Sequence, residues 1–268
     1  MAVDIIDHRL IGALHVRALR RAGLAHDPVA EHIVWQAGTL DALLGGRYDG
    51  DVTLGELLAH ANHGIGTIQH LAGELIVLDG ECWVVGADGR VRPVPPETRT
   101  PFAVLCPFVP QASAHVDEPL ELAGIDAALD ALAPVAEPVV AVRVDGAFAE
   151  LRLRSVHAQN PPYPPLVEVT RDQTEWTLAR ATGTLVGFRF PDAAAGLDVP
   201  GYHLHFLSDD RTHGGHVLEA TLVEGDLAVD GADELHVELP EGMGLGEPGG
   251  ADRAAIRAAE GGRAPDAD

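Results

Sequence analysis

The sequence is poor in cysteine. Its 268 residues include only two, Cys82 and Cys106, each set among apolar neighbours. Two thiols in a chain of this length supply no disulfide framework, and without a CxxC pair they offer no thiolate metal site. We therefore expect both cysteines to be reduced residues of the core.

Basic charge is also scarce. The chain has 18 Lys and Arg against 41 Asp and Glu, a formal net charge of −23, and its basic residues are scattered. A nucleic acid or an anionic membrane surface would need concentrated basic charge to neutralise its phosphates. The composition therefore argues against both partners. A small anionic substrate is compatible with it, provided that a buried metal ion or arginine supplies a local positive charge.

No apolar run approaches the roughly 18 to 20 residues that a membrane-spanning helix requires. Residues 1–9 carry two aspartates, where a secretory signal would place positive charge ahead of an apolar segment. We therefore expect a cytoplasmic protein with no membrane partner.

Aromatic residues make up only 4% of the chain, although 46% of it is hydrophobic. The core must then consist of Val, Leu, Ile and Ala, and β-branched residues that alternate with polar ones favour strands. With 22% charged residues, the composition is typical of a globular protein of one large or two modest domains.

The amino-terminal half shows strand and helix signals in turn. In residues 1–31, apolar residues at helix-like spacing predict a short helical extension. A β-prone run follows from His32, residues 39–45 have the pattern of a capped helix that ends in glycine, and residues 53–56 have the spacing of a capping box. Farther along, an antiparallel meander is expected over 74–94, with Asp-Gly at 88–89 as its turn, and a helix over 120–132. Asp-Gly at 145–146 predicts a second hairpin.

Four prolines between residues 161 and 165 interrupt regular structure and place a crossover or domain boundary there. Beyond them, four short apolar or alternating runs predict strands at 183–190, 202–207, 216–223 and 235–239. We therefore predict a β-rich α+β fold of two domains with mixed or antiparallel sheets and few helices. The expected boundaries are 1–31 for the extension, 32–160 and 161–246 for the domains, and 247–268 for the tail, where only 254–260 has helix-forming character.

The strongest chemical signal is a group of histidines. His203 and His205 are two residues apart in an expected strand, so their side chains point to the same face. His216 follows Gly214 and Gly215 and can supply a third ligand to the same metal ion from the next strand, leaving a fourth position open as in catalytic zinc sites. The chain has 14 histidines, and chance alone supplies about 0.7 HxH pairs, so the third histidine carries the argument.

The histidine pattern leaves alternatives open. His213 could replace His216, although a strand is a stiffer mount than a turn. The pair at 203 and 205 could also be solvated residues of a strand. His60, His63 and His70 lie near a glycine-rich loop, and we interpret them as a solvated helix end more readily than as a metal site.

Seven segments resemble those of the bacterial alpha-acetolactate decarboxylase family, in the same order, within residues 39–240. They include VPGYHLHF at 199–206 and GGHVL at 214–218, and the others are 48–58, 64–67, 73–81, 162–169 and 183–189. The resemblance implies Zn²⁺ bound by the residues that match the family's ligands, which are His203, His205 and His216.

The resemblance also implies that Thr67, Glu74 and Arg154 line the pocket, and that a glutamate of the carboxy-terminal tail joins them. Glu260 is the best match for the tail residue, with Glu247 as a competitor. Residues considered alone leave Arg152 as an alternative to Arg154, because the two lie two apart in a strand.

The implied reaction is the decarboxylation of 2-acetolactate to (R)-acetoin and CO₂, on the route to acetoin and butanediol, by a homodimer. We expect zinc to chelate the ketone and hydroxyl oxygens of the substrate and to stabilise the enediolate as a Lewis acid, with no organic cofactor. Arg154 would orient the carboxylate and, with Glu74 and Glu260, manage proton delivery.

Two other classes of protein share parts of this pattern. A cupin-like metal-dependent isomerase or oxygenase also begins its site with HxH, but it would need a carboxylate ligand such as Asp209 or Asp210. A non-enzymatic metal-binding or sugar-binding β-protein would have no arginine in the pocket and no turnover.

Overall fold

Strands form most of the regular structure. The computed structural model describes residues 7–11, 14–19, 32–133, 138–232 and 234–239, together with Ala254 and Ile256. The strands are β1 (Asp7–Ile11), β2 (Leu14–Leu19), β3 (Ile33–Ala37), β4 (Val52–Thr53), β5 (His63–Thr67), β6 (Glu74–Leu78), β7 (Glu81–Val85), β8 (Val91–Pro93), β9 (Arg99–Thr100), β10 (Phe102–Cys106), β11 (Ala112–Val116), β12 (Leu120–Glu121), β13 (Val139–Ser155), β14 (Thr174–Phe190), β15 (Gly201–Ser208), β16 (Gly214–Ala232) and β17 (Glu234–Glu238).

Helices are few and short. They are α1 (Leu40–Leu44), α2 (Leu54–Leu58), α3 (Leu122–Leu132) and α4 (Leu166–Val169), with single 3₁₀ turns η1 (Gln69–Leu71), η2 (Thr170–Asp172) and η3 (Asp192–Ala194). The predicted β-rich class with few helices is confirmed.

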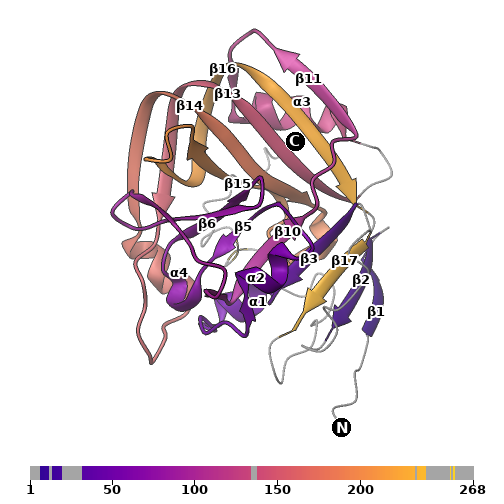
Figure 1. Ribbon diagram of the computed structural model, residues 1–268, viewed down its shortest axis with the longest axis vertical. Helices are drawn as coiled ribbons and strands as arrows, with labels where there is room; N and C mark the ends of the chain where they lie inside the picture. The colour runs from indigo at the N-terminus through magenta and orange to yellow at the C-terminus, as the bar shows by residue number, and fades with distance from the viewer. Residues whose placement is uncertain are drawn as a thin grey trace.

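Two large sheets organise the strands (Figure 1). One has nine strands in the order β1-β2-β17-β3-β10-β5-β6-β7-β8, in which β17 runs parallel to both β2 and β3. The other is antiparallel, in the order β11-β16-β13-β14-β15, with β12 and β15 also paired to β16. The expectation of mixed and antiparallel sheets is confirmed. Each sheet takes strands from both sides of the proline-rich segment at 161–165.

The two sheets pack through one continuous apolar cluster, in which Val104 and Ile76 of the nine-stranded sheet join Val186 and Phe188 of the six-stranded sheet. Hydrogen bonds also cross between them. Ser155 Oγ at the end of β13 donates to the carbonyl of Val85 in β7 at 2.8 Å. Helix α3 covers the opposite face of the six-stranded sheet (Figure 1). One face of β15 therefore points toward the other sheet, and its other face points toward α3.

Local sequence signals determine the helix starts. Thr39 accepts a hydrogen bond from the Ala42 amide and caps α1, which ends at Gly45. Thr53 and Glu56 form the predicted capping box of α2. The meander of β6, β7 and β8 and the helix α3 also lie where the sequence places them.

The predicted hairpin at Asp145 and Gly146 is wrong. Both residues lie inside β13, which runs unbroken between β14 and β16. Gly146 has Gly183 and Gly225 as its neighbours across the sheet, and a Cβ at Gly146 would lie 2.5 Å from the Glu224 carbonyl oxygen. The glycine therefore allows close backbone approach within a sheet. The Asp145 carboxylate accepts hydrogen bonds from Arg143 and Thr184 within the sheet.

The predicted helix in residues 1–31 is also wrong for the two ranges of this segment that the structure describes. Residues 7–11 and 14–19 form β1 and β2, and β2 adds to the nine-stranded sheet beside β17. Val16 is fully buried in the core. Residues 14–19 also alternate apolar and polar side chains up to Ala18, and pairing with β17 favours this period of two over the looser helical spacing.

Candidate active site

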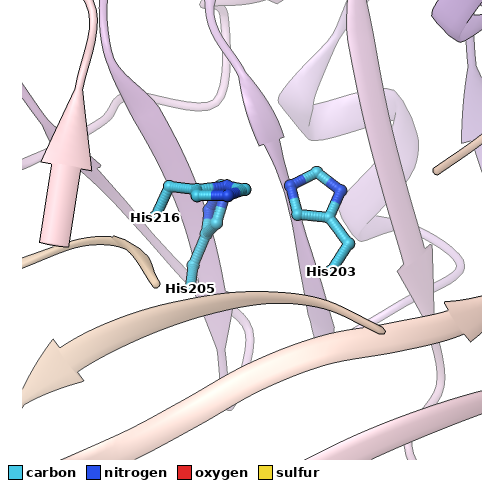
Figure 2. A group of neighbouring side chains, drawn as sticks. All are labelled: His203, His205 and His216. Atoms are coloured by element: carbon cyan, nitrogen blue, oxygen red, sulfur yellow. The ribbon is translucent and has the colours of Figure 1, made fainter. Parts of the chain in front are cut away.

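Three histidines from two neighbouring strands form a buried cluster on the face of the six-stranded sheet that points toward the other sheet. His203 and His205 lie on β15, and His216, on β16, is the cross-strand partner of His205. Their exposed fractions are 7%, 0% and 4%. One nitrogen from each ring can be chosen so that all three lie within 4.8 Å of one another. Figure 2 shows the ring of His203 facing the rings of the other two.

The surroundings of the cluster keep the imidazoles of His203 and His205 neutral. Burial and then the nearby Arg154 lower the pKa of His203 to about 3. Burial also holds the pKa of His205 well below its ordinary value, with added contributions from His203 and Arg154. Neutral imidazole is the form that binds a metal ion. The electrostatics of the cluster therefore match the requirement for ligands.

Hydrogen bonding orients His205 in particular. The Leu75 carbonyl in β6 lies 2.8 Å from its Nδ1, so Nδ1 carries the proton and donates it. The lone pair is then on Nε2, which is buried and has no hydrogen-bond partner among the described residues. A histidine that donates one ring nitrogen to a carbonyl and offers the other is the usual arrangement at a metal site. The three histidines fit a metal ion such as zinc.

Two glycines bring His216 into place. Gly215 has φ of +142°, a conformation that side chains rarely adopt, and a Cβ there would lie 2.9 Å from the Arg154 carbonyl oxygen. At Gly214 a Cβ would lie 2.5 Å from the Phe206 carbonyl oxygen. His213 instead lies in the exposed turn, with its Nδ1 2.7 Å from Thr212 Oγ1. The structure brings His216, rather than His213, to the other two histidines.

Glu74 and Arg154 lie beside the histidines. Glu74 is the first residue of β6, and its Oε2 is 3.5 Å from His205 Nε2. Arg154 is the cross-strand partner of His216, and its Nη1 lies 3.9 Å from Glu74 Oε1. Their exposed fractions are only 7% and 4%. An acid, a cation and three buried imidazoles therefore share one space.

Arg152 has different surroundings, although it lies only two residues before Arg154. Its side chain is 38% exposed and forms ion pairs with Glu175 at 2.9 Å and Glu219 at 2.7 Å. The structure thus separates the two arginines and places Arg154 at the cluster.

Thr67 ends β5 opposite Glu74, its cross-strand partner. Its side chain is buried, and its hydroxyl donates to the Gly73 carbonyl at 2.8 Å. The tail candidates Glu260 and Glu247 lie outside the described residues. Of the predicted site residues that the structure describes, Glu74 and Arg154 lie at the histidines, and Thr67 is the cross-strand neighbour of Glu74.

The other histidines and aspartates considered from sequence lie elsewhere. His60 stacks on Trp35 and His63 on Phe108, at centroid distances of 4.4 and 4.5 Å. Asp210 accepts hydrogen bonds from Ser208 and Thr212 in the turn after β15. Within the part of the chain that the structure describes, the cluster of His203, His205 and His216 is the only group of three metal-ligating side chains.

No pattern in the sequence points to the carbonyl that orients His205. Leu75 contributes a backbone atom, which any residue carries, and only the packing of β6 against β15 brings it near. Among the described residues, none of the helices has the length and apolar character that crossing a membrane requires.

Known proteins resemble this chain in both sequence and fold. The sequence model of the family described as Alpha-acetolactate decarboxylase matches residues 34–245. The chain belongs to the alpha-acetolactate decarboxylase family. The predicted resemblance is thus confirmed, and with it the assignment to an enzyme family, that of a decarboxylating lyase.

Individual members of the alpha-acetolactate decarboxylase family agree with this assignment. The protein of that name from Methylococcus capsulatus is 43% identical over 211 residues, which are 79% of this chain and 81% of the relative. The one from Klebsiella aerogenes is 38% identical over 210 residues, 78% of this chain and 81% of the relative. The crystal structure of alpha-acetolactate decarboxylase from Bacillus subtilis strain 168 superposes with a TM-score of 0.80 at 32% identity, covering 85% of this chain and 99% of that one.

Proposed function

We propose that this protein is a zinc-dependent decarboxylase that converts 2-acetolactate to (R)-acetoin and CO₂. One observation carries the proposal: a chain of the alpha-acetolactate decarboxylase family has three buried histidines beside a buried acid and a buried cation. The acid is Glu74 and the cation is Arg154, 3.9 Å apart at their nearest charged atoms.

The reaction requires charge stabilisation and one proton. When the bond between the carboxylate carbon and C2 breaks, its electron pair forms a double bond between C2 and C3, and the ketone oxygen becomes negatively charged. Proton transfer to C2 of this enediolate then gives acetoin. The site must therefore bind a carboxylate, stabilise charge on neighbouring oxygens and deliver a proton to one face of C2.

The residues of the site match these tasks. Arg154 can form a bidentate pair with the substrate carboxylate and hold it in a fixed orientation. The Glu74 carboxyl lies beside the histidines and, in its protonated form, can deliver the proton to C2. The tail residue Glu260 is a second candidate for this transfer. Because all described parts of the site are buried, water is kept from the reacting carbon.

His203, His205 and His216 would hold the metal ion, for which we propose zinc. Three neutral histidines leave the charge of the ion undiminished, so that when bound it supplies a Lewis acid for the ketone and hydroxyl oxygens. Asp210, one of the two carboxylates considered for a cupin-like site, accepts hydrogen bonds from Ser208 and Thr212 instead.

The test is acetoin formation from racemic acetolactate by the purified protein, with chiral gas chromatography of the product. We expect CO₂ and acetoin in equal amounts and an excess of the (R) product. Absence of acetoin from zinc-loaded protein would overturn the proposal.

The assembly and the location of the protein belong to the same proposal. We propose a homodimer, which light scattering of the purified protein measures as twice the chain mass of 28.2 kDa. Cytoplasmic location and the lack of nucleic-acid and membrane partners remain predictions.

A further inference from the structure

The connection between Thr67 and Glu74 has an unusual backbone. His70 and Leu71 have φ of +66° and +55°, in the left-handed region that residues other than glycine adopt in only a few per cent of cases. Each such residue costs about 1–2 kcal/mol. Strain of this kind persists only where the surroundings hold the backbone in place, and it is common at functional sites. Contacts from three directions hold His70 in this conformation.

A chain of side-chain hydrogen bonds holds His70 from one side. The Tyr163 hydroxyl donates to Asp49 Oδ1 at 2.8 Å, and His70 Nδ1 lies 2.6 Å from the same hydroxyl oxygen. Because the single hydroxyl proton goes to the carboxylate, the histidine must donate its Nδ1 proton to the tyrosine. The order of donation is His70 to Tyr163 to Asp49.

Backbone hydrogen bonds hold the same residue from two further directions. The His70 amide donates to the Tyr48 carbonyl at 2.8 Å, and its carbonyl accepts from the Gln159 amide at 2.7 Å. Gln159 lies five residues after Arg154, in the connection that leaves β13. Tyr48 also contacts Tyr163, with ring centroids 5.2 Å apart.

These contacts link the two pocket residues that come from different sheets. Glu74 begins β6 four residues after His70, and Arg154 lies near the end of β13 five residues before Gln159. The segment from His70 to Glu74 and the segment from Arg154 to Gln159 thus meet at the Glu74–Arg154 pair and again at the contacts of His70. Tyr163, from the proline-rich segment, contributes the side-chain hydrogen bonds to this second contact, through His70 and Asp49.

We propose that Tyr163 is a positioning residue, which acts through His70 and Asp49 to fix Glu74 relative to Arg154 during decarboxylation. The proposal rests on the proposed function for its kinetic consequence. Its structural consequence, restraint of residues 68–75, does not depend on it.

The central variant is Tyr163→Phe, which removes the hydroxyl and keeps the ring against Tyr48. We expect kcat for acetoin formation to fall about 10-fold with KM changed less than 2-fold, because small displacements of reacting groups affect turnover more than binding. Zinc content should match that of the wild type. Hydrogen exchange of peptides covering residues 68–75 should become at least 5-fold faster.

Tyr202→Phe is the matched control. It removes a hydroxyl that donates to Asp130 Oδ1, also at 2.8 Å, on the face of the sheet toward α3. It should leave the exchange of residues 68–75 and the turnover unchanged.

Substitutions at two further positions test separately the Asp49 carboxylate and the His70 ring. Asp49→Ala should reproduce the effect of Tyr163→Phe, whereas Asp49→Asn, which keeps an acceptor oxygen, should restore most of the turnover. His70→Asn should also lower kcat. Since asparagine tolerates the left-handed conformation, this variant removes the ring contact while keeping the backbone.

The outcomes are distinct. Unchanged exchange and unchanged kcat in Tyr163→Phe would overturn the positioning role, as would equal losses in Tyr163→Phe and Tyr202→Phe. If the wild type forms no acetoin, the proposed function fails, and the exchange data alone then decide whether Tyr163 restrains the connection.

Discussion

The two faces of β15 bury ionisable groups with opposite results. On the face toward the nine-stranded sheet, burial lowers the pKa of His203 to about 3. On the face toward α3, burial and then the neighbouring Asp130 raise the pKa of Asp126 to about 7. Tyr202, next to His203 in sequence, points to this second face and donates to Asp130.

The same physical effect therefore serves function on one face and weakens stability on the other. Loss of hydration favours the neutral form of any group. A neutral imidazole gains a lone pair for a metal ion, so the cost of burial is recovered on binding. A carboxyl that must stay protonated gains nothing comparable, and Asp126 should destabilise the fold at neutral pH.

The largest effect that this comparison predicts comes from His205→Ala. Loss of a direct ligand should lower zinc affinity more than the 10–100-fold typical of a lost supporting hydrogen bond, and acetoin formation should disappear with it. Metal content after dialysis and turnover measure the two effects.

His213→Ala is the control for that variant, because His213 lies exposed in the adjoining turn. It should keep both zinc and turnover. Retention of zinc and full CO₂ release by His205→Ala would break the assignment of the ligands.

A second large effect is expected at Arg154. Arg154→Ala should lower kcat/KM by about 10²–10³, the range for loss of one charge-stabilising group in a buried site. Arg152→Ala should leave kcat/KM unchanged, since Arg152 pairs with Glu175 and Glu219 at the surface. If Arg152→Ala lowered kcat/KM and Arg154→Ala did not, Arg152 rather than Arg154 would be the arginine of the site.

The sequence was sufficient to favour these three histidines as the proposed ligands, because short-range rules bring them together. A period of two puts His203 and His205 on one face, and the glycines before His216 allow the next strand to approach. Arg154 could not be separated from Arg152 in this way, because both share a strand face. Their difference comes from the other sheet, which covers only one of them.

A smaller effect tests the outer face. The folded pKa of Asp126, about 7, lies above the ordinary aspartate pKa of 3.8, so the native state keeps a proton that the unfolded chain releases. This contribution to stability is complete below pH 3.8 and is lost as the pH rises through 7. Asp126→Asn should therefore stabilise the protein by about 1–2 kcal/mol at pH 8, with little effect at pH 4 and none on turnover.

Thermal unfolding of both proteins across this pH range measures that difference. A chain of this size should gain about 2–4 °C in Tm per kcal/mol. An equal Tm difference between variant and wild type at pH 4 and pH 8 would contradict the raised pKa.

The smallest expected effect is that of Arg152→Ala on stability. Its two ion pairs are at the surface, where such pairs contribute about 0–1 kcal/mol and are screened by salt. Urea unfolding at low salt and at high salt should show a small loss that salt removes. A loss that persists at high salt would mean that Arg152 is held more like Arg154.

Long-range structure accounts for the predictions that failed. Asp145 and Gly146 have ordinary turn chemistry, and only the glycines on both neighbouring strands explain why the chain continues straight. The network around His70 was equally hidden, because it joins segments that are 93 residues apart at Tyr163. A tyrosine between two pairs of prolines was its only local sign.

The central claim is that His203, His205 and His216 hold the metal ion on which decarboxylation depends. The most direct measurement removes metal with a chelator and adds zinc back in steps, recording acetoin formation against bound zinc. We predict that activity is lost on removal and returns in proportion to zinc, reaching its maximum at one ion per chain. Full activity in protein stripped of metal would contradict the account.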